Sequence, residues 1–356
     1  MIACRKRLRK PQDMEVRKSS ANVTIYDVAR ESGVSYATVS RALNGHADVS
    51  VQTREHVVEV SERLNYHPRA IARGLTKNKS WLMGVAYRGE FDNPFFGKLL
   101  SRAKEIIEPA GYELLFFHDA LGVESSELVT RARYRQVDGL LVAGVTQQSP
   151  AVQALQDLDI PLVSINFRIS SRSSSVISHH FRGSIEAMSH LWSLGHRKIG
   201  IVAGDLDITS GLFRYEAYIR FLKLHGLEVR SDWIARTSFS HEPEESSYRL
   251  VDDVMRSSDR PTAWFCSEDM MAIGAMRACL DLGYSVPEDV SIVGFDDIDA
   301  ARFVQPQLTT VRQDRELIGQ LSARELLRLV GNHEQSGTAI TVPTRLIVRA
   351  STGPAP

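Results

Sequence analysis

Residues 24–43, TIYDVARESGVSYATVSRAL, form a pattern of two short helices joined by a tight turn. Thr24 is a candidate N-cap residue and Asp27 follows three positions later, which is the spacing of a capping box. Gly33 supplies the backbone angles that a tight turn requires, and Ser35 is placed to cap the second helix. The stretch therefore predicts a helix-turn-helix.

The second helix of this pair would carry a surface able to read DNA. Val39 falls on the inward face, so the outward face holds an aromatic side chain, two small ones and an arginine: Tyr36, Ala37, Ser40 and Arg41. Such a face suits the base edges of a DNA major groove. A small helical hairpin with no role in DNA binding remains the alternative for this stretch alone.

Charge is unevenly distributed along a chain that is neutral overall. Residues 1–79 carry 15 Lys or Arg and 8 Asp or Glu, whereas the remaining residues carry 28 basic and 35 acidic side chains. A basic head on an acidic body is expected when one end of a protein meets phosphate groups and the other end does not. This asymmetry favours the DNA-binding interpretation of the helix pair.

Length and composition indicate an ordinary globular protein. With 356 residues, of which 43% are hydrophobic and 24% charged, the chain can bury a sizeable core and form two or three domains. Its cysteines, Cys4, Cys266 and Cys279, are widely separated, which argues against a disulfide framework or a zinc site and fits a reducing compartment. We expect Cys266 and Cys279 to be small core residues. No metal or other cofactor is predicted.

Residues 1–21 form a basic leader that we expect to be disordered. The leader contains no apolar run of seven or more residues, so it predicts neither a signal peptide nor a membrane span. We therefore expect a cytoplasmic protein with no membrane partner. The leader could add phosphate contacts, or Met14 could be the true first residue, and the sequence does not decide between the two.

A third helix and a connecting segment follow the helix pair. Ser50 is a candidate cap for the third helix, and the three helices would close a small DNA-binding domain over 22–66. Residues 67–79 contain Pro68 and Gly74 and are short for an isolated helix. We expect this segment to be a hinge that stays poorly ordered until a partner orders it.

The order TIYDVARESGVSYATVSRALNG, followed by VSVQTREHVVEVSERLNYHPRAIARGL, resembles the lactose-repressor (LacI/GalR) family of bacterial transcription regulators over nearly all of the chain after Val23. The resemblance implies that Tyr36, Ala37 and Arg41 hold base-reading positions. It also implies that Leu75 wedges into the minor groove at the centre of an operator, where unstacking a base step permits a bend. For Leu75, a packing contact with the body is the alternative. The DNA-contacting residues predicted in this way are Thr24, Ser35, Tyr36, Ala37, Thr38, Ser40, Arg41, Asn44, Ala72, Arg73 and Leu75.

From Trp81 onward, buried-strand runs alternate with helical patterns. This rhythm predicts an α/β body of parallel sheets with helices on both faces and a ligand site at the carboxyl ends of the strands. Two such units with a cleft between them are the simplest arrangement, and the family resemblance implies the same two-lobed, periplasmic-binding-protein-like body. The resemblance also implies that the chain crosses between lobes. We expect an effector-binding and dimerisation region over 80–356, with subdomains formed by 80–177 plus 308–335 and by 178–307 plus 336–356.

The candidate effector-binding residues lie near the ends of the predicted strands. Aromatic side chains there are typical of carbohydrate sites, where they stack on the C–H faces of sugar rings, although core packing is the alternative for each of them. The family resemblance implies an arginine for effector hydroxyls, two acidic acceptors and a further polar contact at Arg214, Asp269, Asp296 and Gln313. The complete predicted set is Asn93, Phe95, Phe96, Asn166, Arg168, Arg214, Phe239, Asp269, Asp296 and Gln313.

Catalysis is not predicted at this site. Asp296 and Asp297 are adjacent and could in principle act as an acid/base couple. No nucleophile, metal cluster or phosphate loop accompanies them in the sequence, so we prefer to interpret Asp296 as a hydroxyl acceptor and predict no catalytic residue.

Several residues near the expected cleft depart from the family pattern. His179 and His180 stand where the family commonly has an Asp-Asn pair, and the histidines could instead be solvated turn residues. Glu268 and Asp269 stand where the family has Asn-Asp, and Asn166 takes a position often held by Asp. The pocket is therefore expected to suit sugar-like molecules without indicating one of them.

Two classes of function remain at this stage. The leading prediction is a homodimeric transcriptional regulator, expected to be a repressor, on a pseudo-palindromic double-stranded operator, whose operator affinity is altered by a small carbohydrate-like effector. An Arg168 and Arg214 pair would favour an acidic sugar or a sugar phosphate as that effector. The alternative is a cytoplasmic sugar-binding or sugar-processing protein with an accessory helical head.

Overall fold

A computed structural model describes most of the chain: residues 23–66, 79–87, 93–117, 125–144, 150–156, 158–170, 172–239, 242–332 and 336–356. The chain divides into two compact units, 1–79 and 80–356. The predicted leader over 1–21 and the predicted hinge residues Ala72, Arg73 and Leu75 lie outside the described residues. Within the described ranges, no helix is long and apolar enough to cross a membrane.

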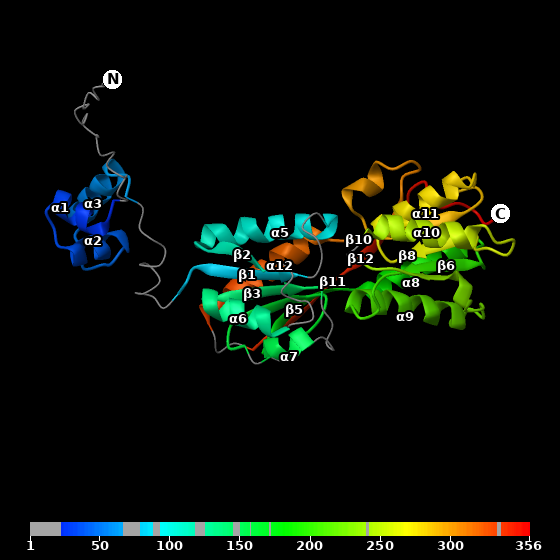
Figure 1. The fold of residues 1–356 in the computed structure, drawn as a ribbon, viewed down its shortest axis with the longest axis horizontal. Coiled ribbons are helices and arrows are strands. Elements are labelled where there is room, and N and C mark those ends of the chain that lie inside the picture. The colour runs from blue at the N-terminus through cyan, green and yellow to red at the C-terminus, as the bar shows by residue number, and fades with distance from the viewer. Residues whose placement is uncertain are drawn as a thin grey trace, which may run out of the picture. The chain divides into compact units, whose positions relative to one another are not determined.

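The described part of the first unit contains three short helices: α1 (Ile25–Ser32), α2 (Tyr36–Leu43) and α3 (Val51–Arg63) (Figure 1). The Asp27 carboxylate accepts hydrogen bonds from the backbone N–H and the hydroxyl of Thr24, at 3.0 and 2.7 Å. The hydroxyls of Ser35 and Ser50 each accept a hydrogen bond of 3.1 Å from the backbone N–H three residues later. Gly33 has a φ of 68°, in the left-handed region that favours glycine. The predicted helix-turn-helix is thus present.

The three helices enclose a small core. Its fully buried side chains are Val28, Val39, Ala42, Val57 and Val60. Larger side chains, among them Ile25, Leu43, Leu64 and Tyr66, are partly buried against this core.

The second unit consists of two lobes, each built, within the described residues, on a six-stranded sheet with helices on both faces (Figure 1). In lobe 1 the strand order is β11-β5-β4-β3-β1-β2, and all the pairings are parallel. The elements of lobe 1 are β1 (Leu82–Tyr87), α5 (Pro94–Ile107), η1 (Glu108–Ala110), β2 (Glu113–Phe117), α6 (Ser125–Arg135), β3 (Gly139–Ala143), α7 (Pro150–Gln156), β4 (Leu162–Ile165), β5 (Ser174–Ser178), α12 (Arg315–Gly331) and β11 (Ala339–Val342).

In lobe 2 the strand order is β12-β10-β9-β8-β6-β7. Strand β12 runs antiparallel to β10, and the other pairings are parallel. The elements of lobe 2 are α8 (His180–Ser193), β6 (Ile199–Ala203), α9 (Thr209–Leu224), η2 (Ser231–Trp233), β7 (Ile234–Arg236), α10 (Pro243–Met255), β8 (Ala263–Cys266), α11 (Asp269–Asp281), β9 (Ser291–Asp296), η3 (Asp299–Arg302), β10 (Thr309–Gln313) and β12 (Thr344–Ile347).

The chain crosses between the lobes, and the crossing points correct the predicted subdomain limits. The prediction places 308–335 in lobe 1, but β10 pairs with β9 and β12 in lobe 2 and only α12 packs on lobe 1. The prediction places 336–356 in lobe 2, but β11 pairs with β5 in lobe 1. A short strand carries no sequence signal for its pairing partner, because the partner lies far away in the chain.

Helices cover both faces of each sheet. In lobe 1, α5 and α12 pack together on one face while α6 and α7 pack on the other, and in lobe 2 the corresponding pairs are α10 with α11 and α8 with α9 (Figure 1). Because both faces are covered, the central strands are buried along their whole length, as in β3 and β6. Cys266 and Cys279 are free thiols buried in the core of lobe 2, as predicted.

Candidate functional site

The exposed face of α2 carries the side chains predicted to read DNA. Tyr36 is 54% exposed, Ala37 and Arg41 are exposed, and Ser40 is half-buried. The ring of Tyr36 stacks on that of Tyr26, with 5.6 Å between the ring centroids, which holds the aromatic side chain at the surface. The outward face therefore has the composition that the sequence predicts.

Four other predicted DNA-contacting residues hold the ends of helices. Thr24 is bonded to Asp27 at the start of α1, and the hydroxyls of Ser35 and Thr38 lie 2.9 Å apart at the start of α2. The side-chain amide of Asn44 donates a hydrogen bond of 2.8 Å to the carbonyl of Ser40 at the end of α2. These contacts fix the geometry of the reading helix.

Arg41 forms an ion pair with Asp48, with 3.1 Å between Nη1 and Oδ2. The two side chains are 60% and 55% exposed, and an ion pair so open to water contributes less than about 1 kcal/mol. The guanidinium can therefore exchange this carboxylate for a base edge or a phosphate at little cost.

In the body, eight of the ten predicted effector-binding residues line one cavity between the two lobes: Asn93, Phe95, Phe96, Asn166, Arg214, Phe239, Asp296 and Gln313. Other residues of the described chain that line it are Gly144, Ile165, Ile208, Thr209, Ser210 and Glu268. These residues end or follow strands of both sheets, so the carboxyl ends of the two sheets meet at the cavity, as parallel sheets require.

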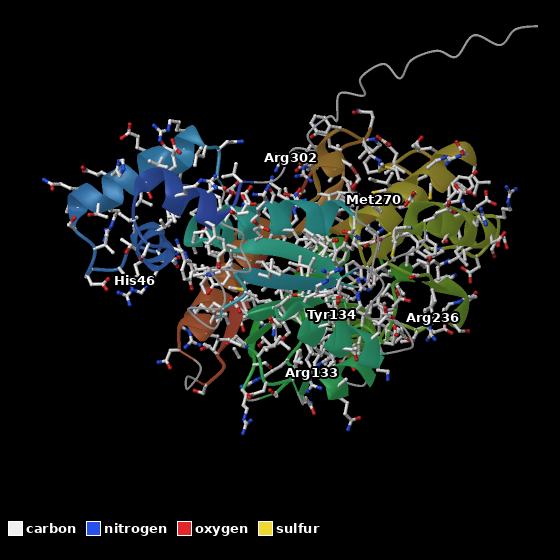
Figure 2. The ribbon with its side chains drawn as sticks, turned by 60° about the vertical axis from the view of Figure 1, so that its left-hand side comes forward. His46, Arg133, Tyr134, Arg236, Met270 and Arg302 are labelled. Atoms are coloured by element: carbon white, nitrogen blue, oxygen red, sulfur yellow. The ribbon has the colours of Figure 1, made fainter. Side chains whose placement is uncertain are left out.

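The cavity has two compartments. The small compartment has a volume of about 60 Å³ and is bounded by residues of both lobes. The large compartment has a volume of about 310 Å³, within the range of sites for small molecules, and shares wall residues such as Phe95, Phe239 and Asp296 with the small one. Met270, labelled in Figure 2, belongs to the wall of the large compartment alone.

Two predicted effector-binding residues do not line the cavity. Arg168 is exposed, and its Nε donates a hydrogen bond to the carbonyl of Ser170. Asp269 is fully buried beneath the wall, where its carboxylate accepts hydrogen bonds from the Thr310 hydroxyl and the Ile298 backbone N–H, at 2.5 and 2.8 Å. Asp269 therefore holds the strand ends in place and leaves no oxygen free for a ligand.

Arg214 is the buried centre of a polar network in lobe 2. Its side chain is 4% exposed and donates hydrogen bonds to the Ser267 carbonyl, to Nδ1 of His180 at 3.3 Å and to Oδ1 of Asp296 at 3.4 Å. The Gln313 side-chain amide donates to the same Asp296 oxygen at 2.5 Å. Burial lowers the pKa of the Arg214 guanidinium, but an arginine stays protonated, so Asp296 has a permanent cationic partner.

His179 and His180, which stand where the family commonly has an Asp-Asn pair, have different environments. His179 is exposed at the start of α8, whereas His180 is fully buried against Arg214 and Phe295. Burial, with the nearby Arg214 charge, lowers the pKa of His180 well below 6.5, so this imidazole is neutral and accepts the Arg214 hydrogen bond. The solvated-turn alternative is thus wrong for His180.

The aromatic wall depends on two glycines. A Cβ atom at Gly204 would lie 2.1 Å from the ring of Phe239, and one at Gly211 would lie 3.0 Å from it and 2.2 Å from a backbone oxygen. Only glycine leaves room for the Phe239 ring to close over the cavity. Phe95 and Phe96 form the opposite wall in an edge-to-face pair with 5.2 Å between ring centroids.

Several polar atoms at the cavity are buried without a hydrogen-bond partner. In the described part of the chain these include Oε1 of Glu268, Oε1 of Gln313, Nε of Arg214, Nε2 of His180 and Oγ of Ser267. An unsatisfied buried polar group costs about 1–3 kcal/mol. A ligand that reaches the lining residues among them, Glu268, Gln313 and Arg214, would recover part of that free energy.

Burial also controls the charge of the carboxyl groups. It raises the pKa of Glu268 well above 4.5 and that of Asp269 well above 3.8, and the neighbouring Asp296 charge adds to both shifts. The pKa of Asp296 is also raised by burial, although Arg214 and Gln313 oppose the shift. The acidic groups therefore compete for ionisation.

Asp297 has a separate role from Asp296. Its carboxylate pairs with Arg349 at 2.5 Å and with Arg312 at 2.6 Å, and these ion pairs outweigh burial and lower its pKa. Asp296 and Asp297 have φ values of 117° and 54°, a strained backbone that turns the two side chains to different environments. An acid/base couple of these two residues is therefore excluded by their placement.

A buried arginine ties the lobes together beside the cavity. Arg315, at the start of α12, is 6% exposed and donates hydrogen bonds to the carbonyl of Pro94 in lobe 1 and to the carbonyl of Asp297 in lobe 2, at 2.9 and 3.0 Å. Its Nη2 also lies 3.2 Å from Asp299. The lobes are thus joined at the mouth of the cavity by contacts that a lobe movement would have to break.

The predicted set omits six residues of the small-compartment wall, four of which lie at the start of a helix, and one supporting side chain. Ile208, Thr209 and Ser210 begin α9 directly after a loop that leaves β6, and Glu268 immediately precedes α11. The supporting side chain is His180, which orients Arg214. The common signal is a position at the start of a helix after a buried strand, which is where an α/β sheet places its ligands.

A helix-turn-helix head joined to a two-lobed body with a polar cavity between the lobes defines a ligand-responsive DNA-binding regulator. Two family models match the chain. Residues 24–69 match the bacterial regulatory proteins of the lacI family, and residues 188–352 match a periplasmic binding protein-like domain.

Relatives cover nearly the whole chain. The HTH-type transcriptional repressor PurR of Pasteurella multocida (strain Pm70) is 32% identical over 334 residues, which are 92% of this chain and 98% of the relative. The lac repressor dimer bound to operator and the anti-inducer ONPF is 28% identical, with a TM-score of 0.83 over 94% of this chain and 100% of that one. The transcriptional regulator CelR in complex with cellobiose is 27% identical, with a TM-score of 0.70 over 92% of this chain and 99% of that one.

The chain belongs to the lacI family of bacterial regulatory proteins. It is a DNA-binding transcriptional regulator with an effector-binding body, and its relatives are repressors rather than enzymes. The alternative of a sugar-processing protein with an accessory head is not favoured by this membership.

Proposed function

We propose that the protein is a homodimeric transcriptional repressor whose affinity for a pseudo-palindromic operator is set by a small polyhydroxylated effector in the interlobe cavity. The observation that carries the proposal is the joint construction of the cavity, because Phe95 and Asn166 of lobe 1 face the same space as Arg214, Phe239 and Asp296 of lobe 2. A ligand that contacts both walls changes the free energy of lobe closure.

The DNA-reading role is proposed for the exposed face of α2. Arg41 presents a guanidinium able to make a bidentate contact with a guanine, and Tyr36 and Ala37 flank it on the same face. One helix of eight residues reaches only a few base pairs, so two copies related by a two-fold axis are needed for useful specificity. Thr38, Ser40 and the helix-capping residues described above would add backbone contacts.

The effector class follows from the chemistry of the wall. Aromatic rings at Phe95, Phe96 and Phe239 suit the C–H faces of a sugar ring, and the orphaned polar atoms of Gln313 and Glu268 suit its hydroxyl groups. Solved relatives include complexes with cellobiose and with ribose, which supports this class. An acidic sugar is disfavoured, because Arg168 lies outside the cavity and Arg214 is already paired with Asp296.

Coupling between the cavity and the DNA is proposed to run through lobe closure. Arg315 bridges Pro94 and Asp297, so an effector that shifts α5 against lobe 2 has to break or strengthen these hydrogen bonds. The carboxyl ends of both sheets move with such a shift, while each sheet stays rigid because its core is closely packed.

The proposal is tested by fluorescence anisotropy with labelled DNA selected from a random pool by the full-length protein. We expect binding to a palindromic sequence that weakens steeply with salt, and a chain lacking residues 1–79 should not bind. A sugar library is then added to the complex, and analytical ultracentrifugation reports the stoichiometry. Failure to select any DNA, or retention of binding without residues 1–79, would refute the DNA-binding part. A monomer on the selected DNA would refute the dimer.

A further inference from the structure

The large compartment of the cavity is strongly acidic. Its wall carries the carboxyl groups of Glu242, Glu244, Glu268 and Asp296, and none of the described residues that line it is a lysine, an arginine or a histidine. In the described part of the chain, Asp296 forms an ion pair with Arg214 on the side of the small compartment, and the Arg214 charge also acts on Glu268. Among the residues that the structure describes, the carboxyl groups of the large compartment therefore outnumber the cations beside them.

Glu268 is the focus of this imbalance. The residue is 93% buried, given its 7% exposure, and lines both compartments. Its Oε1 atom is buried without a hydrogen-bond partner in the described part of the chain. Keeping a buried carboxyl group without a partner destabilises the fold, so its presence at the cavity wall calls for a partner from outside the chain.

The four carboxyl groups in the wall of the large compartment favour a positively charged partner. Burial raises the pKa of Glu268 well above 4.5, and the charges of Asp296, Asp269 and Glu244 raise it further against the opposing effect of Arg214. A hydroxyl group would satisfy the hydrogen bond but would leave the repulsion between the carboxylates. A cation would satisfy both, because it attracts each of the neighbouring carboxylates.

The remaining walls also suit a cation. Phe95 and Phe239 line both compartments, and an ammonium group is attracted to the face of an aromatic ring. One polar atom of Asn93 already has hydrogen-bond partners, because its Oδ1 caps α5 by accepting hydrogen bonds from the backbone N–H groups of Phe95 and Phe96. Its side-chain amide N–H groups are hydrogen-bond donors without a positive charge, so they do not neutralise the carboxylates that would attract a cation.

We propose that the effector carries a positively charged ammonium group, held in the large compartment between Glu268, Glu244 and the ring of Phe239. This inference rests on the proposed function and narrows its effector class from neutral sugars to amino sugars or similar polyhydroxylated amines. Glu268 is the specificity-determining residue, and Arg214 and Gln313 bind the hydroxyl groups on the other side.

The test compares matched sugars that differ only in charge. Full-length protein is titrated with D-glucose, D-glucosamine and D-glucuronate, and with D-galactose, D-galactosamine and D-galacturonate, using thermal shift and then calorimetry. We expect the amino member of at least one trio to bind most tightly. Glu268→Gln, which keeps the shape of the side chain, should weaken that binding about 10- to 100-fold and lower the affinity for the matched neutral sugar by less, so that the preference for the amino sugar is lost.

Glu245→Gln is the control, because Glu245 lies next to Glu244 in the first turn of α10 but pairs with Arg249 and Arg277, which do not line the cavity. This variant should bind every sugar as the parent protein does. Tighter binding of a neutral or acidic sugar, or an amino-sugar preference that survives in Glu268→Gln, overturns the ammonium inference while the proposed function stands. If none of the six sugars binds, both the inference and the carbohydrate-like effector fail, while the DNA-binding part is judged by the selection experiment above.

Discussion

Replacing Arg214 by methionine should destabilise the body through Asp296 rather than through lost packing. Methionine keeps an apolar chain of similar length against Phe295, over which the guanidinium carbon lies 3.9 Å from the ring centroid. The substitution removes the cation 3.4 Å from the Asp296 carboxylate and leaves that carboxylate with the Gln313 hydrogen bond. The variant therefore combines the cost of an unpaired buried carboxylate with the loss of the hydrogen bonds to the Ser267 carbonyl and to Nδ1 of His180, and a double variant that also changes Asp296 separates the two.

The magnitude follows from two limits. Breaking a buried ion pair by removing one partner costs about 3–5 kcal/mol. The carboxyl group can escape by taking up a proton, and for a group with an ordinary pKa of 3.8 this costs about 4 kcal/mol at pH 7. We therefore expect the free energy of unfolding to fall by about 3–4 kcal/mol at pH 7, which corresponds to a decrease in Tm of about 6–16 °C for a lobe of this size.

The pH dependence gives the argument a second readout. Burial already raises the pKa of Asp296, and loss of the Arg214 charge raises it further. A carboxyl group with a raised folded-state pKa destabilises the fold when ionised, and this penalty disappears as the pH falls through that pKa. The difference in unfolding free energy between the parent protein and Arg214→Met should therefore shrink from pH 7 to pH 5.

Urea unfolding followed by circular dichroism measures the effect, with the double variant Arg214→Met/Asp296→Asn as the control. The double variant should recover at least about 1 kcal/mol of the loss, because it no longer buries an unpaired charge. A loss below about 1 kcal/mol for Arg214→Met, or no recovery in the double variant, would refute the reasoning.

Three further predictions follow from single residues. Arg41→Ala should weaken operator binding by about 1–3 kcal/mol and relax the preference at one base pair. If anisotropy titrations show equally weakened binding to all DNA sequences, Arg41 contacts only phosphate. Gly33→Ala should destabilise the head by about 1 kcal/mol because Gly33 has a φ of 68°, although a Cβ atom there would have no neighbour within 4 Å. Gly97→Ala in α5 is the comparison, because Gly97 is equally open but has no positive φ, and it should stabilise the body by about 0.5–1 kcal/mol. Hydrogen exchange measures both effects, and equal effects would contradict the backbone explanation. Burial lowers the pKa of His196 below 6.5, so the unfolded state takes up a proton first and the free energy of unfolding should fall as the pH drops below about 6.5. His196→Gln should flatten that part of the curve of stability against pH. An unchanged slope would show that His196 is not its source.

Local sequence determined the head almost completely. Capping hydroxyls at Ser35 and Ser50, the carboxylate of Asp27 and the glycine at 33 act on neighbours within three or four residues, so their consequences can be predicted without the rest of the fold. The burial of Val39 and the exposure of Tyr36 follow from helical periodicity alone. The same holds for the strand runs of the body, whose continuous apolar character indicates sheets covered on both faces.

The cavity was only partly accessible from the sequence. Position at the ends of strands, together with the family resemblance, identified Arg214, Asp296 and Gln313, because parallel strands must bring their carboxyl ends to one edge. It could not separate Glu268 from Asp269. Consecutive residues at the start of a helix point about 100° apart, so a small rotation of α11 decides which carboxyl group faces the cavity and which one is buried beneath it.

The tertiary structure alone decided which lobe β10 and β11 join and whether Arg168 reaches the cavity. Each depends on contacts between segments far apart in the chain, and short strands and surface side chains carry no local signal for such contacts. The sequence by itself therefore determined the helix-turn-helix head and the α/β character of the body. Only the tertiary structure decided that the large compartment is acidic, because its carboxyl groups come from segments of lobe 2 that are separate in the sequence.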